Sequence, residues 1–195
     1  QGWLSALHVC GKEGAPVEEK KISRALHENE TYIRKRCENC DDILIRPMVL
    51  GEGHSVRCLM VYIEVAVSNM MLDDSAIGKM VNHFREIPAE KIQEFIRKNS
   101  LGIADAEELY DMEEVFGAVL SGNAVFFMDG YDRAMKISSR GYPGLDVSQA
   151  ETEKVLRGSK EGFCDSVKTN AALIRKRLRD TRLKVEEQNT GVRSH

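Results

Sequence analysis

Long apolar runs are missing from this chain of 195 residues. A membrane-spanning helix needs roughly 18 or more consecutive apolar residues, and no such stretch is present. The N-terminal segment also lacks the order of basic, apolar and small residues that marks a secretory signal. We therefore expect a soluble piece. Its start at Gln1 in place of a methionine is compatible with a segment of a longer protein.

Cysteines are too irregularly spaced for a secreted disulfide scaffold, and their odd number favours a reducing compartment. The Cys37 and Cys40 pair lacks the second pair, of cysteines or histidines, that would complete four zinc ligands. We expect no metal site and interpret the pair as two incidental cysteines at the end of a helix. The five cysteines are Cys10, Cys37, Cys40, Cys58 and Cys164.

Motifs of catalysis and cofactor binding are absent from the sequence as well. Gly51 and Gly53 lack the third glycine of a dinucleotide-binding loop. No Ser, His and Asp arrangement with a recognisable nucleophile elbow is present. Asp129 and Asp132 could form an acid–base pair or hold a metal, but without a third ligand nearby we interpret them as turn residues. The sequence predicts no enzyme and no cofactor.

Basic charge is concentrated late in the chain, although the formal net charge is only -3. Residues 1–153 contain 17 Lys or Arg against 26 Asp or Glu, whereas residues 154–184 contain ten against three. No aromatic residues are interleaved with this basic segment after Phe163, and the rest of the chain is acidic. This pattern disfavours nucleic acid as a partner.

Hydrophobic periodicity predicts the elements of the first half. A helix over 18–36 carries a regularly spaced inner face of Ile22, Leu26, Asn29, Ile33 and Cys37. Strands over 43–50 and 56–67 form an antiparallel hairpin, and Pro47 places the first strand at a sheet edge or a bulge. Further helices are expected over 70–84 and from Pro88 onward.

The second half of the sequence predicts a helix followed by a hairpin whose first strand is buried. After a short extended segment at 109–110, a helix runs over 112–120. The apolar run 124–128 is typical of a central strand covered on both faces, and 134–138 returns as its partner. We predict an α/β (α+β) fold: a small mixed β-sheet covered by helices, with a long C-terminal amphipathic helix.

That late helix has a predicted core stripe and a basic border. The core stripe comprises Phe163, Val167, Ala171, Ile174 and Leu178. The border, roughly 100° round the helix, comprises Lys168, Arg175, Arg179 and Arg182. Asn170 lies within the apolar stripe, so its amide needs hydrogen-bond partners from the backbone or from a bound group.

The segment before this helix offers a candidate anion site. Arg157, Gly158 and Lys160 surround the expected helix start, where free N–H groups and the helix dipole favour a carboxylate. The alternative is that Glu161 itself compensates the dipole while the basic residues are solvated. The residues alone leave both interpretations open.

Several segments resemble the soluble N-terminal region of the A subunit of GerA-type spore germinant receptors. The late motif of that family reads approximately Arg-Gly-Pro-Arg-Glu-Gly-Phe, a spacer, Thr-Asn and Leu-Ile-Arg-Arg-Arg. Ser159 here replaces the proline, and segments 120–132, 139–142 and 151–153 also fit. The matching positions are Arg157, Gly158, Glu161, Gly162, Phe163, Thr169, Asn170, Leu173, Ile174, Arg175 and Arg177.

The resemblance implies a protein of the spore inner membrane whose soluble region precedes membrane-spanning segments downstream and works with B and C subunits. It implies two α/β subdomains around a cleft for a nutrient germinant, an amino acid or a sugar. We accordingly expect a loose lead-in over 1–17, a first subdomain over 18–183 and the start of a linker over 184–195. The candidate ligand-binding residues are Arg157, Gly158, Glu161, Asn170, Arg175 and Arg177.

Two functional hypotheses remain at this point. The first is a sensory and coupling domain that contributes to germinant binding and transmits it to the membrane part. The second is a purely structural assembly module that docks to other receptor subunits without binding a ligand itself.

Overall fold

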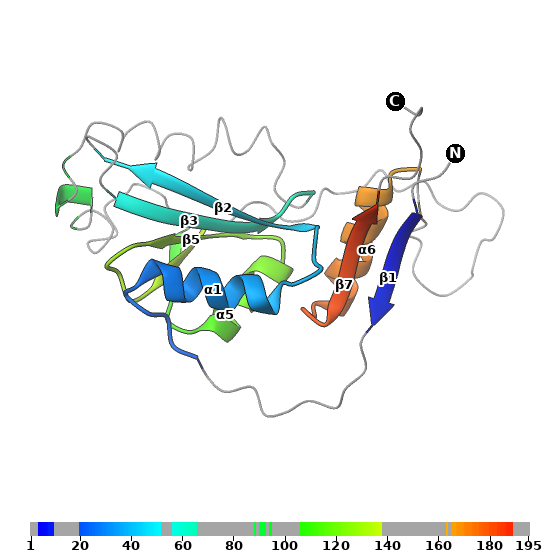
Figure 1. The fold of residues 1–195 in the computed structure, drawn as a ribbon, viewed down its shortest axis with the longest axis horizontal. Helices are drawn as coiled ribbons and strands as arrows, with labels where there is room; N and C mark the ends of the chain where they lie inside the picture. Colours follow the sequence, from blue (N-terminus) through cyan, green and yellow to red (C-terminus); the bar gives the residue numbers. More distant parts are fainter. Residues whose placement is uncertain are drawn as a thin grey trace.

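The computed structural model describes residues 4–9, 20–51, 56–65, 88, 90–92, 94, 106–137, 163 and 165–188, with the backbone alone for 4–9 and 106. Residues 90–92 and 94 are helical. The other described strands and helices form one large sheet, one small sheet and three helices (Figure 1). In chain order they are β1 (Leu4–Val9), α1 (Leu26–Arg36), β2 (Ile43–Leu50), β3 (Val56–Ile63), β4 (Ala106–Leu109), α5 (Met112–Leu120), β5 (Ala124–Met128), β6 (Ala134–Ile137), α6 (Val167–Leu178) and β7 (Leu183–Gln188).

The large sheet has five strands in the order β2-β3-β5-β6-β4, and every neighbouring pair is antiparallel. The predicted mixed sheet is therefore wrong. The helix α5 does join two parallel strands, β4 and β5, but β6 lies between them and pairs with both. The edge position predicted for the strand with Pro47 is confirmed, because β2 ends the sheet.

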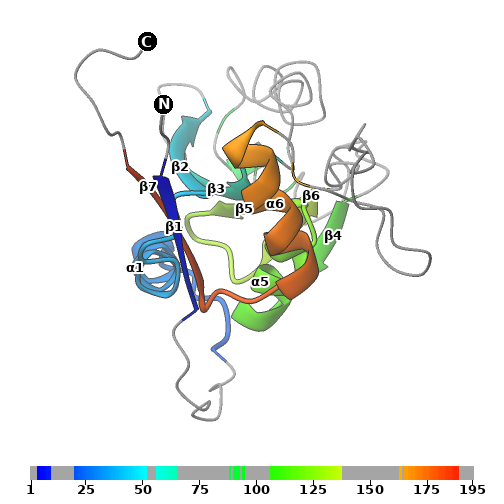
Figure 2. The same ribbon diagram turned by 90° about the vertical axis from the view of Figure 1, so that its right-hand side faces the viewer.

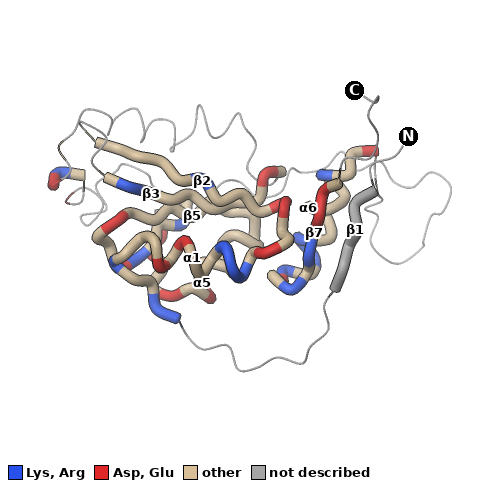
Figure 3. Tube along the Cα trace, in the orientation of Figure 1, with Lys and Arg blue, Asp and Glu red and all other residues tan. Residues whose placement is uncertain are grey.

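Side chains of the inner strands alternate between two cores, as the period of two in a strand requires. On β3, Leu59, Val61 and Ile63 face one core, while Cys58 and Met60 face the other. All five residues of β5 are buried, which confirms the predicted central strand. Figure 3 shows no charged residue on β5, whereas charges gather on α1 and around β7.

Helices α1 and α5 cover one face of this sheet (Figure 1). The predicted inner face of the first helix is confirmed, since Ile22, Leu26, Asn29, Ile33 and Cys37 are all buried, although the helix begins only at Leu26. The helix predicted over 112–120 has the same bounds in the structure. The helix predicted over 70–84 lies outside the described residues, as does most of the one expected from Pro88 onward.

The expected long C-terminal helix is instead the 12-residue helix α6 followed by the strand β7. Arg179 adopts a left-handed backbone conformation with φ 45°, and its N–H is bonded to the carbonyl of Arg175, so the helix ends there. A turn then leads into β7, which pairs antiparallel with β1. Arg182, predicted on the basic border of the helix, lies in that turn.

The predicted core stripe of the late helix is also wrong in part. Phe163 precedes the helix and is 69% exposed, and Leu178 is 52% exposed. The side chains that α6 buries are Ala171, Ala172, Leu173 and Arg175. The stripe fails because α6 packs against β7 and the edge of the main core at once, so its buried positions do not follow one narrow line (Figure 2).

In the part of the chain that the structure describes, no helix combines the length and apolar character needed to cross a membrane. The strand β1 lies within the range predicted as a lead-in, and β7 extends across the predicted end of the first subdomain. The domain division itself stays a prediction.

Candidate functional site

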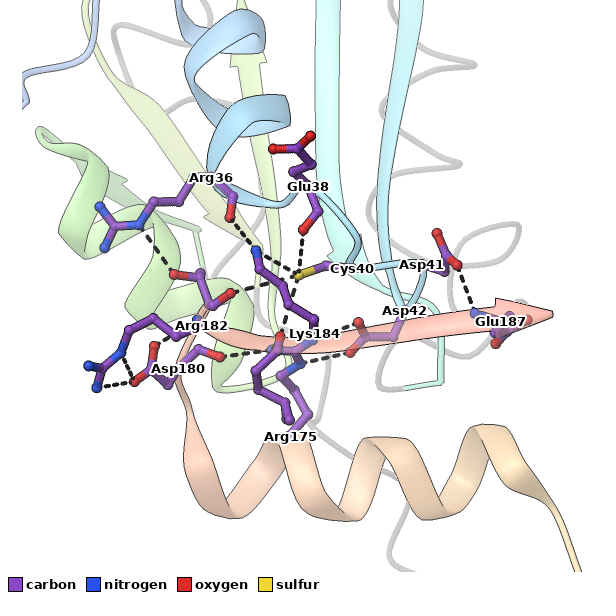
Figure 4. Close-up of polar contacts among 12 residues, drawn as sticks. Arg36, Glu38, Cys40, Asp41, Asp42, Arg175, Asp180, Arg182, Lys184 and Glu187 are labelled. Atoms are coloured by element: carbon purple, nitrogen blue, oxygen red, sulfur yellow. Dashed lines mark hydrogen bonds and ion pairs between the residues drawn. The ribbon is translucent and has the colours of Figure 1, made fainter. Parts of the chain in front are cut away.

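The most connected polar site joins three elements at one end of the sheet. It lies where the turn between α1 and β2 meets α6 and β7 (Figure 4). We call it the Arg175 node and define it by Asp41, Asp42, Arg175 and Lys184, together with Cys40. Cys40, Asp41 and Asp42 are consecutive, but they are more than 130 positions from Arg175 and Lys184, so the fold alone brings the two groups together.

Arg175 is the centre of the node. Its Nε and Nη2 donate to the two carboxylate oxygens of Asp42, both at 2.7 Å, which is the paired geometry that suits a guanidinium. Its Nη1 donates to the backbone carbonyls of Asp180 at 2.8 Å and Leu183 at 2.9 Å. One side chain therefore fastens the turn after α6 and the start of β7 to the α1–β2 turn.

The ion pair is almost completely enclosed. The side chain of Arg175 is 0% exposed and that of Asp42 is 8% exposed. Burial works against the charged guanidinium, but the hydrogen bonds that Arg175 donates to Asp42 and the attraction of that carboxylate overcome it and raise the pKa of Arg175. Removing one partner of such a pair costs about 3–5 kcal/mol, because the other charge stays buried and uncompensated.

The backbone of β7 is held directly as well. The Asp41 N–H donates to the carbonyl of Val185 at 2.8 Å, and the Val185 N–H donates to the carbonyl of Asn39 at 3.0 Å. The carboxylate of Asp41 accepts from the Glu187 N–H at 2.8 Å. Since β1 pairs with the same strand, β7 lies between β1 and the α1–β2 turn.

The two neighbouring cysteines face this junction and are free thiols. The thiol of Cys40 lies 3.5 Å from the carbonyl oxygen of Leu183, and the Lys184 ammonium donates to its sulfur at 3.8 Å. Burial raises the pKa of Cys37 to about 12 and also raises the pKa of Cys40. Among the described residues no cluster of three potential metal ligands is present.

The structure describes only half of the predicted ligand-binding residues. Arg157, Gly158 and Glu161 lie outside the described residues. The other three lie on α6, where Asn170 is half-buried and Arg177 is exposed. The Asn170 N–H donates to the carbonyl of Ser166 at 3.0 Å as part of the helix.

Arg175, predicted on a basic border beside the buried face of the helix, has a fully enclosed side chain. Its partner Asp42 is not among the residues that the sequence predicted for a site. The one local signal is that the acidic pair Asp41 and Asp42 directly follows the cysteine pair Cys37 and Cys40. Nothing in the spacing of Asp42 and Arg175, 133 positions apart, indicates that they meet.

The acidic residues around β4 and α5 have structural partners. Glu108 accepts from Arg133 at 2.6 Å and from the hydroxyls of Tyr110 at 2.9 Å and Tyr131 at 3.1 Å. Asp111 caps α5 by accepting from the Glu114 N–H at 2.8 Å. These carboxylates fix local structure and are not simply solvated.

A pocket of about 260 Å³ lies at the other end of the molecule, between the start of α1 and the β2–β3 hairpin. Two charged side chains on its rim are already paired: Arg57 with Asp129 and Glu30 with Arg34. The lining residues are Leu26, His27, Glu30, Pro47, Met48, Val49, Arg57 and Cys58.

Several known proteins are similar to this chain. The family described as Bacillus/Clostridium GerA spore germination protein matches residues 31–195. Spore germination protein KA of Bacillus subtilis (strain 168) is 30% identical over 171 residues, which cover 87% of this chain and 31% of that protein. The uncharacterized membrane protein YfkQ of the same strain is 30% identical over 183 residues, 94% of this chain and 35% of that protein. The chain spans about a third of the length of these relatives.

A solved structure has the same fold. It is the N-terminal domain of the A subunit of the Bacillus megaterium spore germinant receptor GerK3, with a TM-score of 0.61 and 22% sequence identity. The match covers 84% of this chain and 58% of that one.

Proposed function

Because this chain belongs to the GerA family of spore germination proteins, as its sequence predicts, we propose that it is a coupling domain of a germinant receptor A subunit. In this proposal the chain lies in the N-terminal region of a spore inner-membrane protein. It works with B and C subunits during germination. Its task is to relay a change between the sheet and the chain that follows β7.

The Arg175 node is the observation that carries this proposal. The strand β7 is the last described element, and it is fastened to the rest of the fold through Arg175, Asp41 and the α1–β2 turn. A displacement of β7 must therefore stretch or break buried charge-assisted bonds. Buried pairs of this kind have two discrete arrangements, paired or broken, which suits a two-state relay.

The proposal extends to the binding of a germinant by this domain. A nutrient held near Arg157, Gly158, Glu161, Asn170 and Arg177 would act on α6, the helix that carries Arg175. A ligand contact by Arg175 itself requires the node to open, because its side chain is 0% exposed. Binding that favours one arrangement of the node would shift the population of receptor states.

Arg175→Lys in the full-length receptor gene tests the coupling function. Lysine keeps the charge but loses the paired contact with Asp42 and one of the two carbonyl contacts. We expect spores with this receptor to respond to nutrient at least about tenfold more slowly or to respond without nutrient, because a tenfold change needs only about 1.4 kcal/mol. The fall in optical density of a spore suspension measures the response.

Lys168→Met is the matched control, since Lys168 lies on the same helix and pairs with Glu64 in an exposed ion pair. Receptor abundance and co-isolated subunits are measured in both strains. A normal nutrient response in the Arg175→Lys spores would refute coupling through the node. Loss of the partner subunits, with no response left to measure, would support the assembly module instead.

A further inference from the structure

We propose that Cys37 and Cys40 form a redox-sensitive pair that becomes oxidised when the Arg175 node opens and then holds it open. This inference deepens the proposed function, because it assigns a regulator to the same node. The partner reagent is a disulfide, either a small molecule or a protein thiol–disulfide carrier.

The backbone places the two thiols within reach of each other. The Cys40 N–H donates to the carbonyl of Cys37 at 3.1 Å, which closes a turn at the end of α1. In such a turn the first and fourth Cα atoms lie within about 7 Å of each other. Disulfides join residues whose Cα atoms are about 4.4–6.8 Å apart, so the turn needs little rearrangement. Asn39, between them, already adopts the left-handed conformation with φ 58°.

The surroundings distinguish the two sulfurs. Lys184 donates to the sulfur of Cys40, so an ammonium group contacts that thiol directly. The charges of Lys184 and Arg175 favour the thiolate of both cysteines, but burial raises both pKa values, that of Cys37 to about 12. Because the thiolate is the attacking species, Cys40 is the first nucleophile and Cys37 resolves the intermediate.

The chemistry balances with one disulfide, RSSR. The Cys40 thiolate attacks one sulfur of RSSR, forms a mixed disulfide and releases RS⁻, which takes up the proton that Cys40 lost. The Cys37 thiolate then attacks the Cys40 sulfur and releases the second thiol. The two cysteines give up two electrons and two protons, and RSSR becomes two RSH.

Closure of the node protects the pair. Cys37 is 7% exposed and Cys40 is 5% exposed, and the carbonyls of Thr181, in the turn before β7, and of Leu183, at the start of β7, cover the sulfur of Cys40. RSSR can therefore react only after β7 has moved away. In the oxidised form Cys40 has no S–H to donate to the Leu183 carbonyl, and its sulfur points to Cys37, so β7 returns less tightly.

Peptide mapping detects the bond directly in the full chain. Trypsin cuts after Arg36 and after Arg57, and Pro47 blocks the site at Arg46, so residues 37–57 form one peptide with these two cysteines only. After incubation with glutathione disulfide we expect this peptide to appear two hydrogens lighter. If only the dithiol peptide appears at every ratio of glutathione disulfide to glutathione, the proposal is overturned.

Single variants test the order of attack. Cys37→Ser leaves Cys40 without a resolving thiol, so we expect it to accumulate a glutathione adduct on Cys40. Cys40→Ser removes the nucleophile, and we expect little adduct on Cys37. An adduct that forms only on Cys37 would overturn the assigned roles.

The link to the node is tested with Arg175→Lys, which opens it more often, and with Arg57→Lys as a control in a remote exposed pair. We expect the disulfide to form at least about tenfold faster in Arg175→Lys and at the wild-type rate in Arg57→Lys. Amide exchange at Asp41 and Val185, which are bonded across the junction, should also quicken in the oxidised chain. Equal rates in all three proteins would overturn the proposal.

These outcomes are separable from those of the proposed function. Spores that carry Cys37→Ser keep the ion pair and should respond normally to nutrient under reducing conditions. If the disulfide never forms but Arg175→Lys spores respond abnormally, coupling stands and redox control falls. If the disulfide forms and Arg175→Lys spores respond normally, the redox reaction stands and coupling through the node falls.

Discussion

Asp42 and Arg175 are the residues on which the junction depends. Each is polar and almost fully buried, and each satisfies the other at two oxygen–nitrogen contacts of 2.7 Å. An enclosed charge of this kind is tolerated only when its partner is in place. The pair therefore makes the position of β7 sensitive to single substitutions.

Asp42→Asn should lower the free energy of unfolding of the chain by about 3–5 kcal/mol, because it leaves the Arg175 charge buried without a carboxylate. Urea unfolding followed by circular dichroism measures the change. Glu64→Gln, in the exposed pair with Lys168, is the control and should change it by about 0–1 kcal/mol. A loss below 1 kcal/mol for Asp42→Asn would show that the junction does not depend on this pair.

Among the elements, α1 is fixed from outside its own sequence. Its N-cap residue is Ala25, whose side chain cannot accept a hydrogen bond from the first turn. Instead the carboxylate of Asp129, in the turn between β5 and β6, accepts from the Leu26 N–H at 3.0 Å. The same carboxylate accepts from Arg57 on β3 at 2.7 Å. One aspartate thus ties a helix, a turn and a strand together.

Asp129→Ala should lower the free energy of unfolding by about 0.5–2 kcal/mol, the usual effect of losing a helix cap. Amide exchange at Leu26 should increase with it. Asp132→Ala is a matched control in the same turn, since Asp132 only pairs with exposed Arg24 and neighbouring Arg133. Equal effects of the two substitutions would argue against the capping role.

The element that sequence reasoning predicted least well is α6. It begins at Val167, later than the start predicted near 157–160, and Ser166 caps it by accepting from the Thr169 N–H at 3.3 Å. It ends at a non-glycine residue, Arg179, which takes the left-handed conformation. The hydrogen bonds of Arg175 to the carbonyls of Asp180 and Leu183 hold the turn that follows. A tertiary contact thus ends the helix.

At the scale of the whole molecule, lowered carboxylate pKa values link stability to pH. The bond from the Leu26 N–H, followed by Arg57, lowers the pKa of Asp129 below its ordinary 3.8. Burial opposes ionisation of Glu108, but hydrogen bonds from Arg133, Tyr110 and Tyr131 overcome this and lower its pKa below 4.5. The stability that they contribute is present above those ordinary values and is lost as the pH falls through the folded-state values.

We therefore expect the urea midpoint of the chain to fall steadily as the pH drops below about 4.5. Glu108→Gln removes one contributing carboxylate, so the slope of midpoint against pH should be shallower in that variant. Unfolding curves from neutral to acidic pH measure the slope. A wild-type midpoint that rises on acidification would contradict the pKa assignments.

The sequence by itself determined the family, the β2–β3 and β5–β6 hairpins, the central place of β5 and the inner face of α1. These depend on local periodicity, on turn residues and on a contiguous motif, which neighbouring positions express. The tertiary structure alone decided the antiparallel order of the sheet, the end of α6, and the meeting of Asp42 with Arg175. A long-range pair leaves no periodic trace in sequence, because its partners are brought together only when the intervening elements pack. The same packing encloses Arg175, which the sequence predicted only on the border of the buried face.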